Sequence, residues 1–419
     1  MVERVSPRKP SRREGYSPIV EREGHPLLRP DESRPLGMVL SGGGARGAFQ
    51  AGVWKALATH PRGIVELPRI ISGTSAGAIN AMLIACEKSP DEILEFWLDL
   101  ARKPPVRANE GFFTSLRRVL SDIVLTEPLR GVVSRGRDAR KALGTLRQHN
   151  WFLPSGIQAS LLEHVLTARF DAVSRILDGI HSTHLFDTEE LGRRLKAAVG
   201  GEVIPKTDIR LAINCVDART GEVVRVVNYH PQSRTSARNY RYFEEIPVDM
   251  VLASASIPLV FNPVVHANMT LWDGGLLVNS PMAPAIALGA GRILPVLVTS
   301  EPAPGVSAPM DSIGQCIERV IDVLLENAYN ADRKLMLERN ELASHMPQKR
   351  LRRVQLFTAI RPQASELFNA GSYLFFEHDN LLSMYEAGVV AGRHWIERVP
   401  KIDAGLYSGP PTKAPGGAG

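Results

Sequence analysis

The sequence lacks the marks of a secreted or membrane-spanning protein. Its 419 residues include only three cysteines, Cys86, Cys215 and Cys316, which lie far apart in apolar stretches. Such thiols are typical of reduced structural cysteines, so a disulfide framework is excluded and a reducing compartment is indicated. No run approaches the roughly 18 apolar residues of a spanning helix, and residues 1–34 hold no apolar segment of a signal peptide or anchor. We therefore expect a cytoplasmic protein.

Long runs of one charge are also missing. The formal net charge of +6 is the difference between 50 basic and 44 acidic residues spread along the chain. The densest basic cluster, Lys349–Arg353, is short and has no aromatic residues interleaved with it, as a single-strand-binding groove would need. This composition argues against a nucleic-acid partner and leaves a mild bias toward anionic surfaces.

What the chain does contain is enough apolar sequence for a large core. The hydrophobic fraction of 44% is ordinary for a globular protein. We expect one main domain at 36–300, with a helical insertion at about 100–185, and a C-terminal helical extension at 301–400 packed on it. Scattered charges and prolines predict a disordered N-terminal tail at 1–35, and a Pro- and Gly-rich composition predicts a flexible tail at 401–419.

Two strand–turn–helix units open the main domain and predict a parallel sheet of the α/β class. In each, a short apolar run is followed by a glycine turn and then by a helical pattern. The units comprise Met38–Leu40 with Ala48–Leu57, and Arg69–Ile71 with Ala78–Glu87. Further strands are predicted at Ile209–Val216 and Glu222–Asn228, as a hairpin, and at Arg292–Val298; further helices are predicted at Ser312–His345 and Leu381–Ile396.

The region from Pro90 to Asp187 is interrupted by prolines, and its helical patches predict an insertion or cap. One patch places basic side chains beside apolar ones, an arrangement that suits an anionic lipid surface. A helix packed on its own domain is the more frequent arrangement. The patch comprises Phe112, Phe113, Leu116, Val119 and Leu120 with Arg117 and Arg118.

The segment Gly73-Thr74-Ser75-Ala76-Gly77 matches the pattern of a nucleophile elbow and lies between a predicted strand and a predicted helix. Such a turn holds its serine in a strained conformation that projects the hydroxyl group, and glycines flank it because neighbouring backbone passes close by. The alternative is a glycine-rich turn with an incidental serine. The elbow makes Ser75 the candidate nucleophile.

A second glycine loop, Ser41–Gly47, has two interpretations. Gly42, Gly44 and Gly47 satisfy the dinucleotide-binding fingerprint, with Glu66 at a suitable distance to bind a ribose. Alternatively, the N–H groups of Gly42, Gly43 and Gly44 bind the oxyanion of a tetrahedral intermediate, where one donor contributes about 2.7–4 kcal/mol. The elbow close behind favours the oxyanion hole. Arg46 is expected to hold the loop, with a phosphate head group as the alternative partner.

The third feature is Asp273-Gly274-Gly275, which follows a predicted strand end. In a site that excludes water, an aspartate can accept the serine proton as attack proceeds. Taken alone, the segment is better explained as a turn aspartate followed by glycines, which is a common loop arrangement. A Ser-His-Asp triad with His230 or His266 is the chemical competitor, but neither histidine stands in a recognisable context. His181 and His184 lack further ligands at suitable spacing, so no metal is expected.

In this order, the three glycine-containing segments resemble the signatures of the patatin-like phospholipase family. Ala253–Pro258 and Leu185–Asp187 resemble further stretches of it, and the likeness spans about residues 36–300. The resemblance implies a three-layer α/β/α fold with a mostly parallel central sheet. It also implies a Ser75–Asp273 dyad without histidine, an oxyanion hole at Gly42–Gly44, and Arg46, Gly47, Gly73, Gly77, Gly274 and Gly275 as supporting positions.

For function, the resemblance implies hydrolysis of phospholipids, lysophospholipids or glycerides, often at a membrane surface, with no metal or cofactor. Two alternatives stay open. A transacylase would pass the same acyl group to a lipid alcohol, and a non-catalytic module would only bind a lipid or nucleotide on the same fold. Residues 100–185 match nothing recognisable, so the sequence leaves the preferred lipid open, as it does the oligomeric state.

Overall fold

The computed structural model describes residues 31, 33–60, 66–119, 178–232, 239–300, 313–346, 353–363, 365–368, 373 and 376–398. Residues 1–30 of the tail expected at 1–35, the tail expected at 401–419, most of the insertion, and most of the Lys349–Arg353 cluster lie outside these residues. The division of the chain into domains stays a prediction.

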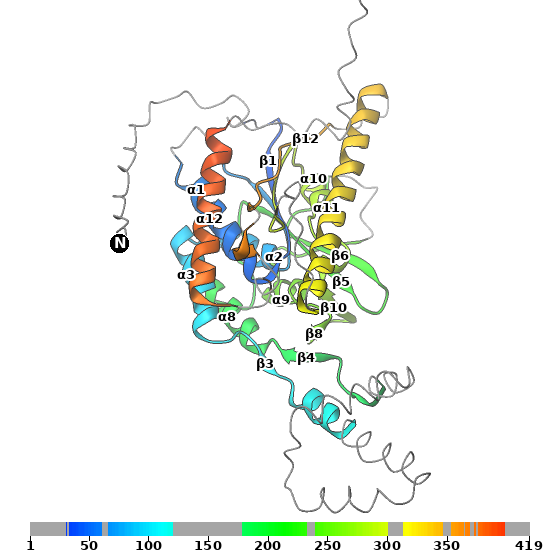
Figure 1. The fold of residues 1–419 in the computed structure, drawn as a ribbon. Helices are drawn as coiled ribbons and strands as arrows, with labels where there is room; N and C mark the ends of the chain where they lie inside the picture. Colours follow the sequence, from blue (N-terminus) through cyan, green and yellow to red (C-terminus); the bar gives the residue numbers. More distant parts are fainter. Residues whose placement is uncertain are drawn as a thin grey trace, which may run out of the picture.

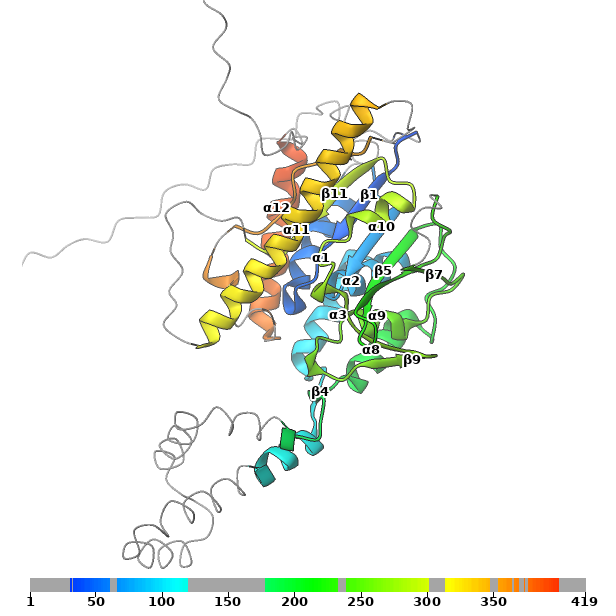
Figure 2. The same ribbon diagram turned by 90° about the vertical axis from the view of Figure 1, so that its right-hand side faces the viewer.

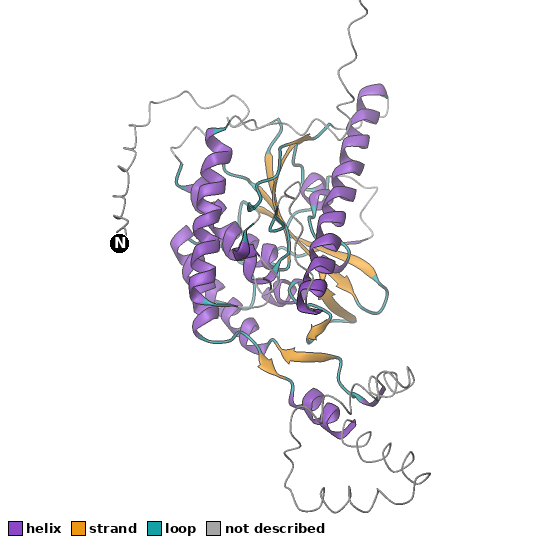
Figure 3. Ribbon diagram, viewed as in Figure 1, coloured by secondary structure: helices purple, strands orange, loops and turns teal. Residues whose placement is uncertain are grey.

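A mixed, mostly parallel sheet forms the centre of the described part of the chain (Figures 1 and 3). Its main path runs β12-β11-β1-β2-β5-β10-β9, with β6 beside β5 and β7 beside β6. The pairs among β12, β11, β1, β2 and β5 are parallel, whereas β5–β6, β5–β10 and β10–β9 are antiparallel. The strands are β1 (Leu36–Leu40), β2 (Ile70–Thr74), β5 (Arg210–Asp217), β6 (Glu222–Val227), β7 (Tyr240–Tyr242), β9 (Val264–His266), β10 (Met269–Asp273), β11 (Arg292–Val296) and β12 (Gln355–Leu356).

Strand β5 pairs with two different strands along one edge. Its first half is parallel to β2, which ends at Thr74 opposite Asn214. Its second half is antiparallel to β10, which ends at Asp273 opposite Cys215. The last residues of β2 and β10 therefore meet at neighbouring positions of β5.

Alternating residues of the strands point into two separate apolar cores, as the pleat of a strand requires. Met38 and Leu40 belong to one core, which contains α1, α2, α3, α8, α9 and α12, while Val39 between them belongs to the other, with α10 and α11. Figure 2 looks onto the face that carries α10 and α11. The predicted three-layer α/β/α fold with a mostly parallel sheet is confirmed.

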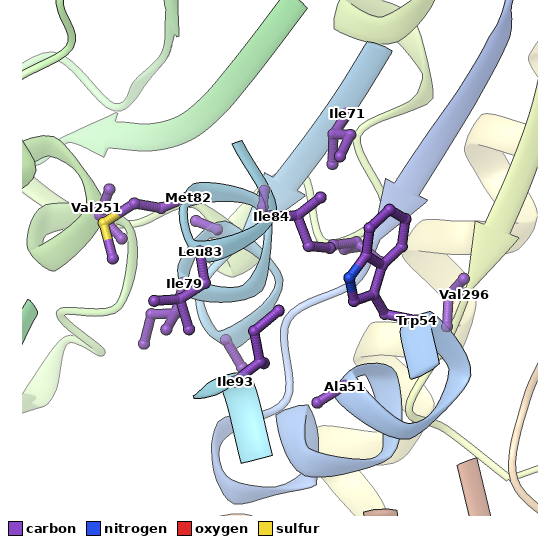
Figure 4. Close-up of a cluster of buried hydrophobic side chains, with 14 of the residues drawn as sticks. Ala51, Trp54, Ile71, Ile79, Met82, Leu83, Ile84, Ile93, Val251 and Val296 are labelled. Atoms are coloured by element: carbon purple, nitrogen blue, oxygen red, sulfur yellow. The ribbon is translucent and has the colours of Figure 1, made fainter. Parts of the chain in front are cut away.

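The helices follow the predicted units closely. The elbow is followed by α2, which carries apolar side chains on all sides and is therefore buried in the first core. In Figure 4 this helix lies between Val251 and Trp54. The helices are α1 (Gly47–Ala58), α2 (Ala76–Ala85), α3 (Pro90–Arg102), α8 (Glu189–Val199), α9 (Val248–Ser254), α10 (Met282–Ala287), α11 (Ile313–His345) and α12 (His378–Glu397), with short 3-10 turns η2 (Gly44–Arg46), η5 (Gly274–Leu276) and η7 (Glu366–Phe368).

One part of the predicted cap region belongs to the main core instead. Helix α3 begins with a capping box, in which the side chains of Ser89 and Glu92 each accept a hydrogen bond from the other's main-chain N–H. Pro90 stands in the first turn of the helix, where the N–H that proline lacks would have no intrahelical acceptor. Ile93 and Trp97 of this helix are fully buried. Pro90 therefore starts a core helix rather than breaking one.

Three short strands form a second sheet at the base of the molecule as drawn in Figure 1: β3 (Arg107–Ala108), β4 (His184–Asp187) and β8 (Leu259–Phe261). Strand β3 lies near the start of the predicted insertion at about 100–185, and β4 lies at its end. Residues 110–119 are helical, and the described side chains of the predicted lipid patch, Phe112, Phe113, Leu116 and Val119, are half-buried. Contact of this patch with lipid stays a prediction, and no described helix is long and apolar enough to cross a membrane.

Helix α12 lies unusually close to α1. A Cβ atom on Gly52 of α1 would collide with the main chain of Tyr385, and one on Gly388 of α12 would collide with the main chain of Phe49. Gly52 and Gly388 thus allow the backbones of α1 and α12 to pack directly against each other. This contact packs the last described helix against the first strand–turn–helix unit.

Candidate active site

Ser75 occupies a strained turn between β2 and α2. Its φ of 54° and ψ of −125° place a residue that carries a side chain in a region favoured by glycine, which costs about 1–3 kcal/mol. The carbonyl group of Ser75 accepts from the main-chain N–H of Ala78 at 2.9 Å, so helix α2 begins directly at the serine. The geometry is that of the predicted elbow.

Asp273 meets this serine because β10 ends beside the end of β2. The carboxylate accepts a hydrogen bond at 2.6 Å from the main-chain N–H of Gly275, and it interacts with the side chain of Ser75. Both side chains are nearly enclosed, with Ser75 and Asp273 each 5% exposed. Burial raises the pKa of Asp273 to about 6, although the interactions with the Ser75 side chain and with the Gly275 N–H lower it. The structure therefore brings together the two residues of the predicted dyad.

The glycine loop lies over the serine. A Cβ atom on Gly42 would stand 3.0 Å from the Cβ of Ser75. The N–H of Gly42 donates to Asn279 through both the main-chain oxygen, at 3.2 Å, and Oδ1, at 3.0 Å. Within the described residues, no acceptor is found for the N–H groups of Gly43 and Gly44. That all three N–H groups bind the oxyanion stays a prediction. The geometry favours the N–H groups of Gly43 and Gly44 as the donors, because that of Gly42 is already bonded to Asn279.

Asn279 was missed by the sequence reasoning. It stands six residues after Asp273, in Leu277-Val278-Asn279-Ser280-Pro281, and is 2% exposed. A buried polar residue so near the aspartate was the available signal. Its side chain fixes the first residue of the glycine loop, so the segment that supplies Asp273 also holds this loop.

Arg46 anchors the other end of the loop and is fully buried. Its guanidinium group donates to the main-chain oxygens of Val298 at 3.3 Å and Phe368 at 3.1 Å, and pairs with Asp322 of α11 at 3.3 Å. It also lies 3.7 Å from the ring centroid of Tyr373, whose hydroxyl bonds to Asp322. The expected holding role of Arg46 agrees with these contacts.

Gly44 has a positive φ of 55°, and a Cβ atom there would collide with the main-chain oxygen of Tyr373. The loop is therefore closed from outside by the C-terminal part of the chain. The other supporting glycines stand at close approaches: Gly47 against Trp97, Gly73 against Gly77, Gly77 against Leu40, Gly274 against Asn214, and Gly275 against the Asp273 carboxylate.

The residues of the competing interpretations have other partners. Glu66, the candidate ribose ligand, pairs with Arg292 and receives the N–H of Leu36 at 3.5 Å. His230 stacks on Tyr242, and His266 meets the ring of Phe243. Among the described residues, no histidine bonds to Ser75 or Asp273.

His181 and His184, which were considered as metal ligands and for which no metal is expected, differ in their surroundings. His184 bonds to Asp187 at 2.9 Å, whereas His181 is exposed. The described residues hold no group of three or more histidine, cysteine or acidic side chains suited to a metal.

The site thus combines an α/β sheet, a strained serine at a strand end and two glycine loops beside it. The sequence matches the patatin-like phospholipase family over residues 38–286, more than half of the chain. The protein belongs to this family.

Solved structures with some likeness include VipD from Legionella pneumophila, with 15% sequence identity and a TM-score of 0.30 over 85% of this chain and 67% of that one. Another is ExoU in its heterodimeric complex with SpcU from the type III secretion system of Pseudomonas aeruginosa, with 20% identity and a TM-score of 0.23. That alignment covers 77% of this chain and 58% of the other. A comparison with curated proteins gives no match.

Proposed function

We propose that the protein hydrolyses acyl esters of lipids, of the phospholipase A or lysophospholipase type, with Ser75 as nucleophile and Asp273 as proton acceptor. One observation carries the proposal: the side chain of a strained serine interacts with a buried carboxylate whose pKa is raised to about 6. A carboxylate with such a pKa is ionised at neutral pH yet basic enough to accept a proton during attack.

The reaction proceeds in two halves. Oγ of Ser75 bonds to the ester carbonyl carbon while Asp273 takes the hydroxyl proton, and the carbonyl oxygen becomes an oxyanion held by Gly43 and Gly44. When the C–O bond to the alcohol breaks, the proton passes from Asp273 to the departing oxygen. Water then attacks the acyl-serine and gives its proton to Asp273, which returns it to Ser75 as the fatty acid leaves.

Exposed apolar side chains beside the dyad support a lipid substrate. Leu276 and Leu277, which directly follow Asp273-Gly274-Gly275, are 57% and 48% exposed. Large apolar side chains left in water at the edge of a site suit contact with acyl chains or a membrane surface. Phospholipids, lysophospholipids and glycerides all present such chains, so the protein acts as a peripheral enzyme.

The test uses two substitutions that keep the site's shape. Ser75→Ala and Asp273→Asn should each lower the release of fatty acid from phosphatidylcholine vesicles and from a p-nitrophenyl acyl ester by at least about 10³-fold. Labelling by a fluorophosphonate probe should occur at Ser75 of the wild type and be lost in Ser75→Ala. Wild-type-like turnover in either variant contradicts the dyad.

Adding monoacylglycerol as an acyl acceptor separates the transacylase alternative. A hydrolase releases free fatty acid whether or not the acceptor is present. A product in which the acyl chain has moved to the acceptor instead of to water would contradict hydrolysis as the main reaction.

A further inference from the structure

Ser254, the last residue of α9, lies directly behind the elbow. Its side chain is fully buried. Its Oγ accepts a hydrogen bond from the main-chain N–H of Ser75 at 3.0 Å and donates one to the main-chain oxygen of Asn214 at 2.7 Å. One hydroxyl group therefore links the elbow to strand β5.

The place of this hydroxyl in the sheet is unusual. The parallel pairing of β2 with β5 ends at Thr74 opposite Asn214. If it continued by one residue, the N–H of Ser75 would donate to the oxygen of Asn214 as the next bond of the ladder. Instead the chain turns away into the strained elbow, and Cys215 pairs with Asp273 of β10. The Ser254 hydroxyl lies between the N–H of Ser75 and the main-chain oxygen of Asn214 and makes a hydrogen bond to each of them.

We propose that Ser254 is a positioning residue for catalysis. Its hydroxyl fixes the peptide group between Thr74 and Ser75, and this peptide group sets the direction in which the Ser75 side chain points toward Asp273. The inference rests on the proposed function of Ser75. Ser254 touches neither the substrate nor the reacting atoms, so it acts through the geometry of the elbow alone.

The side chain of Asn214 adds a second support to the same turn. It is fully buried, and its Nδ2 donates to the main-chain oxygen of Gly73 at 3.0 Å. Asn214 thus holds the residue two positions before Ser75, while its main-chain oxygen holds Ser254. Without the Ser254 hydroxyl, the Ser75 N–H is a buried donor without an acceptor, and the turn must shift to satisfy it.

The same helix end offers a matched control. Ser256 is also fully buried, and its Oγ donates to the main-chain oxygen of Leu252 at 2.9 Å. It meets the site only through its main-chain oxygen, which accepts from the N–H of Asp273 at 2.8 Å and which alanine retains. Ser256→Ala therefore measures the effect of losing a buried hydroxyl here without releasing the elbow.

The experiment compares wild type, Ser254→Ala, Ser254→Cys and Ser256→Ala of the full chain. Steady-state kinetics on a p-nitrophenyl acyl ester, the rate of fluorophosphonate labelling, and Tm are measured for each. We expect kcat of Ser254→Ala to be about 10- to 100-fold below that of Ser256→Ala, with KM within about twofold. The labelling rate should fall in parallel. Ser254→Cys, which keeps a weaker acceptor, should lie between the two.

Equal kcat in Ser254→Ala and Ser256→Ala, or a loss confined to KM, overturns the positioning role. If Ser254→Ala does not fold, Ser254→Cys carries the comparison, and a kcat equal to that of Ser256→Ala overturns the role in the same way. Failure of the proposed function has a different signature, because the wild type itself would then neither take up the probe at Ser75 nor release fatty acid.

Discussion

At the residue scale, one carboxylate sets the pH range of the proposed reaction. Asp273 accepts the serine proton only in its ionised form. Because burial raises its pKa from 3.8 to about 6, this form is lost at a higher pH than for an exposed aspartate.

The pH dependence of kcat/KM should therefore show an acidic limb near pH 6. We expect a plateau above about pH 7 and a fall of about tenfold per pH unit below pH 6, because a protonated Asp273 cannot accept the proton. A neutral p-nitrophenyl ester, followed between pH 4.5 and 8.5, keeps titration of the substrate out of the profile. A limb near pH 4, or none, would contradict the assignment of this carboxylate as the base.

The residues of the site differ in how well the sequence predicted them. Ser75 and Asp273 stand in short local patterns that carry their own signal, and the structure brings both together. Asn279 and Ser254 have no such pattern, because what makes them important is the partner each meets: Gly42 for the first and the Ser75 N–H for the second. Each of these contacts joins residues about 180–240 positions apart and depends on how the strands are ordered in the sheet. A local sequence pattern therefore cannot predict it.

At the element scale, the C-terminal helices complete the glycine loop. Helix α11 brings Asp322 to Arg46, and the main chain of Tyr373 covers Gly44. These residues lie beyond the part of the chain that matches the family, at 38–286. The loop of this protein is thus held partly by an element that the family match does not include.

Loss of the Asp322 carboxylate should loosen the loop. In Asp322→Asn, Arg46 keeps its bonds to Val298 and Phe368, but its ion pair with the Asp322 carboxylate, which is a quarter exposed, is lost. We expect a loss of stability on the order of 1 kcal/mol and a several-fold lower kcat, measured by urea unfolding and ester hydrolysis.

Glu338→Gln is the matched control, because its pair with Lys334 lies on the exposed surface of the same helix. It should change neither quantity measurably. If Asp322→Asn behaves like this control, α11 does not hold the loop through Arg46.

The elements themselves were predicted well. The helices expected at Ala48–Leu57, Ser312–His345 and Leu381–Ile396 are found within a few residues, and the expected hairpin is formed by β5 and β6. What the sequence could not show is that one edge of β5 is shared by β2 and β10. Hydrophobic periodicity reports which side of a strand is buried, not which strand lies beside it.

At the scale of the whole molecule, exposed leucines near Asp273 should matter only when the substrate forms a surface. We expect Leu277→Asp to lower activity on phospholipid vesicles by about tenfold or more, because a charge replaces apolar contact with the acyl region, and to leave hydrolysis of a dissolved short-chain ester within about threefold. Vesicle sedimentation and fatty-acid release measure the two effects.

Leu342→Asp provides the comparison. This leucine of α11 is 49% exposed, against 48% for Leu277, but it stands near the far end of the long helix. It should leave vesicle activity unaltered. Equal losses in the two variants would mean that Leu277 has no particular place at the lipid surface.

The shared edge of β5 also bears on how the protein is made. The elbow and the aspartate lie about 200 residues apart in the chain, and the residues that hold the glycine loop come later still, at Asn279, Asp322 and Tyr373. A growing chain that has reached α9 contains the serine and Ser254 but not the carboxylate. On the proposed mechanism, a ribosome-bound or truncated product that ends at α9 has the nucleophile without its proton acceptor, so it cannot hydrolyse lipids until β10 is made and has paired with β5.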